Sequence, residues 1–374
     1  MLSMSNTSSL RGLLSKFAVA GTKVGPIGLD LAAEKMHLVQ MEQTGDGLRI
    51  RAGVSLAYPI PREELLANPS KFKKFVHQGL ARRPFKGRRV VSCLPAGDLN
   101  IMFISFKQTD GLSVNDAIIR ELRERVKEKL EESVIDFLSI RDDHNQTGEK
   151  HAIVAIAPKQ SVMNYLDLLQ DAGLDPIALD IGPAALSRLI GNLPRNKTHP
   201  NVLLVNFGRD KSYLSVIWGK RLMLDREIDF GEARLIARAC KSLNIKEEMA
   251  HQLLYQQGMN AHNNLHSDNE FARTLAEVLR PEFASLAEEV NKTLIYTASV
   301  TRGSSVEQSY LLGSVARYPH VASFMQNLLS VPVEVLNPFN SFASNEHAAV
   351  LSELDPIAGI ALASGLCMRG MTDG

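Results

Sequence analysis

The sequence predicts an α/β protein with two related halves that face each other across a cleft. A pattern of three strands and two tight turns occurs twice in the 374 residues. The first copy opens with G-P-I-G-L-D-L (Gly25–Leu31), and the second opens with N-V-L-L-V-N-F-G (Asn201–Gly208). A repeated three-stranded meander implies two similar halves with their turns at the cleft. Backbone N–H groups in such turns are suited to bind phosphate.

Length, charge and cysteine content exclude several classes of protein. A chain of 374 residues exceeds one typical hydrophobic core, so two or more domains are expected. The net charge of +1 gives no global field that favours nucleic acid or membrane. Three widely spaced cysteines predict neither a disulfide scaffold nor a thiolate zinc site, and they favour a reducing compartment. The longest apolar stretch, Pro356–Met368, is shorter than the ~18 residues of a membrane span and predicts a buried helix.

The N-terminal tail has two interpretations. It lacks the basic start, apolar centre and cleavage site of a secretory signal. Four apolar residues nevertheless share one helical face: Leu10, Leu13, Leu14 and Phe17. The tail is therefore either a weakly ordered segment or an amphipathic foot on an anionic leaflet, which alone would bind weakly.

In the first half, residues 47–56 alternate apolar and polar side chains, which predicts a strand with one solvated face. Pro59 and Pro61 end this strand, and a helix is expected to about Gly79. Arg89–Leu94 then predicts another strand.

The next segment predicts a small α+β unit in the order strand, helix, strand, helix. Ser113 and Asp116 have the spacing of a capping box, and an i, i+4 apolar stripe from Val114 to Leu130 predicts a long helix. The polar stretch Arg141–Lys150 predicts a loop. The remaining elements of this unit are expected at 100–106, 151–157 and 161–172.

The second half follows a strand at 176–181 and a linker-like stretch, Leu193–Pro200. Helices are expected near 232–239, 246–256 and 270–299, the last with a possible break at Pro281. A strand at 309–313, a helix to Leu329 and a strand at 331–335 follow. The helix at 357–368 is expected to pack on the first half.

Two clusters outside the turns have functional and structural interpretations. Eight basic residues, with no acidic residue among them, lie between Lys71 and Arg89. This cluster is a solvated surface, a surface for anionic lipid or an acidic partner, or, least favoured because its phenylalanines resemble a buried helix face, a nucleic-acid site. His262 and His266 have metal-ligand spacing, but the segment is loop-like and lacks the catalytic glutamate of a zinc protease. No metal site is predicted.

Four segments together resemble one known family. They are D-L-A-A-E-K-M-H (Asp30–His37), N-F-G-R-D-K-S (Asn206–Ser212), Y-L-L-G-S-V-A (Tyr310–Ala316) and P-V-E-V-L-N-P-F (Pro332–Phe339). In order and spacing they are similar to segments of the type IV pilus assembly protein PilM family, relatives of the cell-division protein FtsA. The last segment is the most specific match.

The resemblance implies an actin-like (ASKHA) two-lobed α/β fold with an inserted small α+β subdomain. The expected ranges are 1–23 for the tail, 24–99 for the first lobe, 100–174 for the inserted subdomain, 175–200 for the return and crossover, 201–340 for the second lobe, and 341–374 for the C-terminal helix. It also implies a nucleotide site at the turns. The candidate residues are Asp30, Ala32, Ala33, Asn206, Gly208, Ser212, Gly313 and Ser314.

The chain departs from the family pattern at this nucleotide site. Ala32 and Ala33 replace Gly-Ser, His37 replaces Lys, and Asn206 replaces the acidic residue that would hold hydrated Mg²⁺. Ser314 and Val315 replace glycines of the adenosine turn, and valine tolerates positive φ badly. Gly182 stands in place of Glu. We therefore expect a degenerate site that holds no ATP/Mg or holds it weakly, with no catalytic residue assigned.

By resemblance, the expected function is a cytoplasmic scaffold of a type IV pilus or related assembly platform, peripheral to the inner membrane. Its expected partner is a PilN-like single-span membrane protein, bound through that protein's N-terminal peptide near the inserted subdomain. A homo-oligomer is left open, and nucleic acid is not expected as a partner. Two alternatives are an active actin-like ATPase or small-molecule kinase, against which Asn206 argues, and an FtsA-like filament-forming membrane tether.

Overall fold

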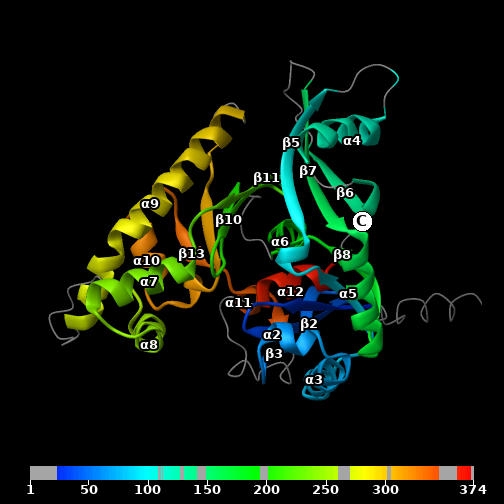
Figure 1. Ribbon diagram of the computed structural model, residues 1–374, viewed down its shortest axis with the longest axis horizontal. Helices are drawn as coiled ribbons and strands as arrows, with labels where there is room; N and C mark the ends of the chain where they lie inside the picture. Colours follow the sequence, from blue (N-terminus) through cyan, green and yellow to red (C-terminus); the bar gives the residue numbers. More distant parts are fainter. Residues whose placement is uncertain are drawn as a thin grey trace, which may run out of the picture.

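The computed structural model describes residues 23–107, 111, 113–126, 130–140, 149–193, 201–259, 270–300, 305–344 and 360–371. These residues form two lobes, each built on one sheet, and a third, smaller sheet that rises from the first lobe (Figure 1). The linker-like stretch and the histidine pair fall outside the described residues, as does most of the N-terminal tail. Within the described ranges, no helix is long and apolar enough to cross a bilayer.

The first lobe holds a six-stranded sheet in the order β14-β3-β2-β1-β4-β8. The strands are β1 (Lys23–Leu31), β2 (Lys35–Thr44), β3 (Gly47–Ala57), β4 (Arg89–Cys93), β8 (Asp175–Asp180) and β14 (Ala343–Ser344). One face packs on α2 (Arg62–Leu66), α3 (Pro69–Ala81) and α5 (Lys159–Asp171). The other face packs on α6 (Gly182–Gly191) and α12 (Ile360–Cys367). Gly28 of β1 is required here, because a Cβ at this position would overlap the backbone of α12.

The second lobe repeats the same strand pattern. Its sheet order is β11-β10-β9-β12-β13, with strands β9 (Val202–Phe207), β10 (Ser212–Trp218), β11 (Arg221–Ile228), β12 (Gln308–Gly313) and β13 (Val333–Val335). The first strand of each meander pairs antiparallel with the second and parallel with the strand that follows the meander. The duplication expected from the sequence is therefore present in the structure.

Four helices accompany the second sheet: α7 (Glu232–Leu243), α8 (Glu247–Gln257), α9 (Glu270–Val300) and α10 (Val321–Gln326). The short helix α11 (Pro338–Ser341) instead contacts α12 and β14 of the first lobe. The long helix expected at 270–299 is present, and the possible break at Pro281 does not occur, because α9 is continuous through this residue. Leu279 and Phe283 on either side are fully buried in the core of the lobe. Their burial holds the helix together although proline removes one backbone donor.

The small sheet contains β5 (Asn100–Lys107), β6 (Ser133–Ile140) and β7 (Glu149–Pro158) in the order β5-β7-β6, and α4 (Val114–Arg125) covers one face. Ser113 caps α4 by accepting a bond from the Asp116 N–H. The expected strand–helix–strand–helix order missed β6, whose apolar residues face both sides and hide the period of two. The helix is also shorter than expected, since Val126 and Leu130 lie beyond its end but still pack on the same core.

The position of α5 bears on the boundary of the inserted subdomain. Tyr165 and Leu169 of this helix, together with Ala172 just after it, are buried in the first-lobe core and not in the core beneath α4. We therefore propose that the inserted subdomain ends at Pro158 rather than at residue 174. Helix α6 follows β8 and was not anticipated, because its G-P-A-A start has no side-chain cap.

Candidate functional site

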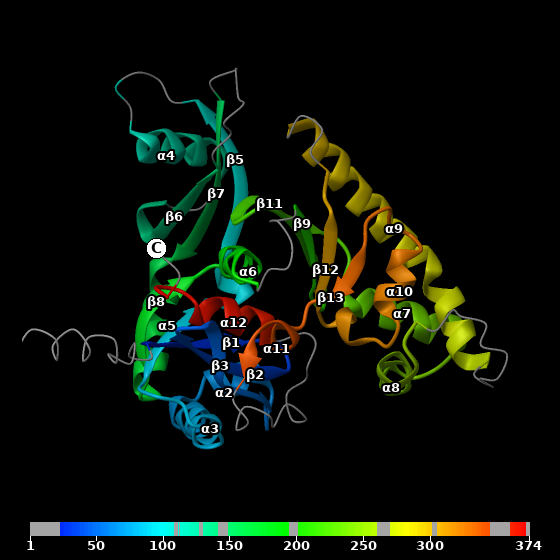
Figure 2. The same ribbon diagram turned by 180° about the vertical axis from the view of Figure 1, so that it is seen from behind.

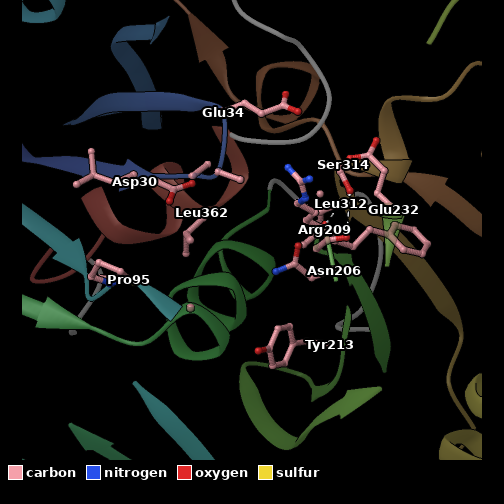
Figure 3. A pocket seen from close by; sticks show the side chains of 18 of the residues that line it. Asp30, Glu34, Pro95, Asn206, Arg209, Tyr213, Glu232, Leu312, Ser314 and Leu362 are labelled. Atoms are coloured by element: carbon pink, nitrogen blue, oxygen red, sulfur yellow. Dashed lines mark hydrogen bonds between the residues drawn. The ribbon is translucent and has the colours of Figure 1, made fainter. Parts of the chain in front are cut away.

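A cleft of about 600 Å³ lies between the lobes (Figure 3). Seven of the eight candidate residues line it: Asp30, Ala32, Ala33, Asn206, Gly208, Gly313 and Ser314. Ser212 does not. This residue is fully buried at the start of β10, and its hydroxyl donates to the Phe230 carbonyl at 2.6 Å. Its role is therefore to fix the end of the second-lobe sheet.

The first turn joins β1 to β2 and places Asp30 opposite His37 in the antiparallel register. Burial raises the pKa of the Asp30 carboxyl from 3.8 to about 7, although the positive charge of Arg62 opposes the shift. His37 is buried and its Nδ1 hydrogen-bonds the Ser55 hydroxyl on β3. The lysine expected at this position in the family would carry a fixed positive charge, and histidine does not.

The second turn, at residues 208–211, joins β9 to β10 and closes on itself. The Gly208 N–H donates to the Lys211 carbonyl at 3.1 Å, and the Gly208 carbonyl accepts from the Glu232 N–H at 3.0 Å. A Cβ on Gly208 would overlap the Lys211 carbonyl oxygen. Packing of the turn alone is therefore enough to require glycine here, and its N–H is already used within the turn.

Asn206 lies near the end of β9, where the resemblance predicts a metal-binding acid. In register it pairs with Tyr213 on β10 and with Leu312 on β12, and it faces the cleft (Figure 3). An amide oxygen can coordinate Mg²⁺ through water, but it carries no charge to offset that of the ion. Among the described residues, no group of three or more His, Cys, Asp or Glu side chains is placed to hold a metal ion.

The adenosine turn follows β12. Gly313 has a φ of 84°, and a Cβ there would overlap the Phe207 carbonyl oxygen. The Ser314 N–H donates to the same oxygen at 2.9 Å, and Ser314 itself has a φ of −61°. The expectation of strain at Val315 is wrong, because its φ is not positive and its side chain is buried in the second-lobe core.

Sequence reasoning missed a polar cluster beside this turn. The Glu232 carboxylate accepts hydrogen bonds from the Tyr255 hydroxyl at 2.7 Å and from the Tyr318 hydroxyl at 2.8 Å. The Arg317 guanidinium lies 4.6 Å from the centre of the Tyr255 ring and also hydrogen-bonds its hydroxyl. Arg317 directly follows the G-S-V-A segment, but nothing in that segment signals its contacts.

Arg317 also joins the two lobes. Its guanidinium lies 3.2 Å from the carboxylate of Glu34 in the first turn, across the mouth of the cleft. Both residues line the cleft. The described structure therefore has an ion pair between the first turn and the adenosine turn, the two segments between which a nucleotide would be held.

The cleft has no excess of positive charge with which to bind a polyphosphate. Six carboxyl groups line it against four permanently cationic side chains. The acids are Asp30, Glu34, Asp225, Glu227, Glu232 and Glu247, and the cations are Lys35, Arg62, Arg209 and Arg317. Burial raises the pKa of Asp225 to about 6, while the Ser215 hydroxyl donates to it at 2.5 Å. Apart from Asp30 and Asp225, whose pKa values burial raises, the four remaining carboxyls are matched by the four cations, so the lining has no excess of positive charge to attract a phosphate.

Comparisons with known proteins identify the family and the fold of this chain. A sequence model of the family described as type IV pilus assembly protein PilM matches residues 28–371. A chain from a PilM–PilN type IV pilus biogenesis complex superposes with a TM-score of 0.69 and 21% identity, over 92% of this chain and 98% of that chain. The actin-like α/β fold expected from the sequence is confirmed.

Two other solved structures are more distant. The ethanolamine utilization protein EutJ from Carboxydothermus hydrogenoformans gives a TM-score of 0.49 and 15% identity, over 91% of this chain and 89% of that chain. MreB5 of Spiroplasma citri bound to AMPPNP gives 0.44 and 10%, over 83% and 91% of the two chains.

Proposed function

Because this chain belongs to the PilM family of type IV pilus assembly proteins, we propose that it acts as a cytoplasmic scaffold, peripheral to the inner membrane. In this proposal it binds the cytoplasmic N-terminal peptide of a PilN-like single-span membrane protein. The PilM–PilN complex to which the chain is structurally similar supports a partner of this kind.

The observation that carries the proposal is the edge of the small sheet. Strand β6 is an outer strand, since the sheet order is β5-β7-β6. Val134 and Leu138 on β6 are 41% and 40% exposed. Ile135 and Phe137, which lie between them in sequence, pack instead on the core beneath α4. Edge strands offer main-chain hydrogen bonds, and exposed apolar side chains beside them offer binding energy for an extended peptide. We place the peptide there.

The strand register connects this edge to a buried core. Leu138 lies opposite Ile153 of β7, which is fully buried in the core that the two lobes share. The exposed apolar side chains of β6 are therefore continuous with a rigid, packed layer. A peptide side chain that covers Leu138 would extend this layer rather than rest on a mobile surface.

A paired substitution tests the peptide site. We expect Val134→Asp with Leu138→Asp to weaken binding of a synthetic PilN-like N-terminal peptide at least about tenfold, because a carboxylate would be desolvated at each position. Fluorescence anisotropy on the full chain measures it. Met249→Asp in α8, which alters another exposed apolar side chain (52% exposed), is the control and should leave the affinity unchanged. Equal affinities for the paired variant and the unaltered chain would rule out this site.

We also propose that the nucleotide site is degenerate. Three features support this: the neutral Asn206, a cleft lining without excess positive charge, and the Arg317–Glu34 ion pair between the two turns. Losing one charged hydrogen-bond partner costs about 1.5–3 kcal/mol, so the missing acid alone weakens Mg-ATP substantially. Calorimetric titration should give no heat or millimolar affinity. Micromolar binding, or phosphate release above that of an Asn206→Ala variant, would contradict the proposal.

A further inference from the structure

Most of the basic cluster singled out in the sequence is exposed in the structure. Seven of its eight residues are exposed, and the six other than Lys71 make up what we call the basic face: Lys73, Lys74, Arg82, Lys86, Arg88 and Arg89. The first two lie on α3, and the others lie between α3 and the first residue of β4. The phenylalanines of the cluster point the other way, since Phe72 and Phe75 are buried in the first-lobe core. The aromatic side chains are thus unavailable for stacking on nucleic-acid bases.

Little negative charge balances this face. Within the described part of the chain, Lys73, Lys74, Lys86, Arg88 and Arg89 form no ion pair with a carboxylate, whereas the neighbouring Lys71 pairs with Glu64 at 3.0 Å. The acidic side chains on the adjacent elements are Glu63 and Glu64 on α2, Asp167 and Asp171 on α5, and Asp175 at the start of β8. Glu63 pairs with Arg62 and Glu64 with Lys71, so neither pairs with the basic face. The face therefore keeps a strong local positive charge on a chain whose net charge is only +1.

The basic face lies where the chain enters the fold. The Gln40 amide donates both to the Gly25 carbonyl and to the Lys86 carbonyl, at 2.9 and 2.8 Å, so the start of β1 and the basic face are neighbours. The 22 residues before Lys23 must therefore join the fold beside this face. Their sequence carries the apolar set Leu10, Leu13, Leu14 and Phe17 at helical spacing.

The same side of the molecule carries the proposed peptide site. In both views, α5 and β6 lie on the side of the first lobe that is away from the second lobe (Figures 1 and 2). The basic face adjoins the C-terminal end of α5, since the His77 ring on α3 hydrogen-bonds the Ala172 carbonyl there at 3.1 Å. A flat anionic surface on this side would not obstruct the interlobe cleft.

From these observations we propose that the basic face docks directly on the anionic surface of a phospholipid bilayer. Each Lys or Arg near such a surface contributes an attraction that falls off within a Debye length. Docking in this orientation turns β6 toward the side from which the peptide of a membrane-spanning partner emerges. The orientation rests on the proposed peptide site, but lipid binding itself does not.

Flotation with protein-free vesicles tests this inference. The full chain should bind vesicles that contain phosphatidylglycerol and should not bind vesicles of phosphatidylcholine alone, and added salt should weaken binding. We expect the variant K73Q/K74Q/R88Q to bind about tenfold or more weakly. The matched control is R238Q/K241Q/K246Q, which removes the same number of Lys and Arg from exposed positions on and just after α7 in the second lobe. It should bind as the unaltered chain does.

Three outcomes would overturn the proposal. One is no binding of the unaltered chain to phosphatidylglycerol vesicles. Another is equal loss in both triple variants, which would indicate a general charge effect. The third is loss caused by Leu13→Gln with Leu14→Gln but not by K73Q/K74Q/R88Q, which would leave only the tail in contact with lipid. Peptide affinity in solution should be the same for K73Q/K74Q/R88Q and the unaltered chain, so failure of the peptide site is recognised separately.

Discussion

At the scale of single residues, the cleft contains two carboxyl groups whose pKa values are raised by burial. Burial raises the pKa of Asp30 to about 7 and that of Asp225 to about 6. In an actin-like protein that binds nucleotide, the acid in the first strand holds hydrated Mg²⁺ and must be ionised to do so. Asp30 keeps the residue type of the family but, in this structure, titrates near neutral pH. Asp30, a residue that the sequence alone marks as intact, therefore carries less negative charge near neutral pH than an exposed aspartate does.

These shifts give a pH dependence with a defined sign. Below 3.8, Asp30 is protonated in both the folded and the unfolded chain, so it contributes nothing. Between 3.8 and about 7 the folded chain retains a proton that the unfolded chain has lost, so the free energy of unfolding falls as pH rises. Asp30→Asn should flatten this decline when thermal unfolding is followed over that range.

The matched control for this measurement is Asp46→Asn, in the exposed turn between β2 and β3. It should leave the slope of stability against pH as it is in the unaltered chain. If Asp30→Asn changes the slope no more than Asp46→Asn does, burial does not hold the Asp30 carboxyl in its protonated state.

At the scale of elements, α5 shows how a helix belongs to the lobe on which it packs rather than to its neighbours in sequence. It directly follows β7 of the small sheet, which led to the sequence-based boundary at residue 174. Tyr165 and Leu169 are nevertheless buried against the first-lobe sheet, and the Tyr165 hydroxyl hydrogen-bonds Ser92 of β4 at 2.7 Å. The inserted subdomain proper is then β5, α4, β6 and β7.

A substitution in α5 tests this assignment. Leu169 is fully buried, and Leu169→Ala should lower the free energy of unfolding by about 2–5 kcal/mol because it leaves a cavity in the first-lobe core. Met163→Ala on the same helix changes a side chain that is 53% exposed and should cost less than about 0.5 kcal/mol. Urea denaturation followed by circular dichroism measures both. Similar costs for the two variants would show that α5 is not part of that core.

The sequence predicts most elements and fails where local pattern and burial diverge. The two meanders are predictable because alternation and turn residues mark every strand. Strand β6 cannot be predicted in this way, because Val134 and Leu138 place apolar side chains on its exposed face and so remove the alternation of apolar and polar residues. The continuity of α9 through Pro281 depends on burial of its neighbours. In the site, the candidate turns lie together, but Arg317 and Tyr255 could not be found, because their contact joins segments 62 positions apart in sequence.

At the scale of the whole molecule, the two lobes share one hydrophobic core. It contains Val39 and Met41 of β2, Leu204 of β9 and Leu312 of β12, and α6 and α12 contribute to it as well. The Arg317–Glu34 ion pair adds a second connection, although Glu34 is about half exposed and such a pair contributes at most about 1 kcal/mol. The shared core therefore joins the lobes far more extensively than this ion pair does. A protein built in this way can present a partner surface constantly, which suits a scaffold.

The most direct test of this account is a titration of the unaltered full chain with the PilN-like N-terminal peptide, performed with and without Mg-ATP. The account predicts saturable binding of the same affinity in both conditions, because the proposed peptide site at β6 and the packing of the lobes do not depend on nucleotide. Peptide binding that occurs only when Mg-ATP is present would contradict it, since the cleft would then be a working nucleotide switch.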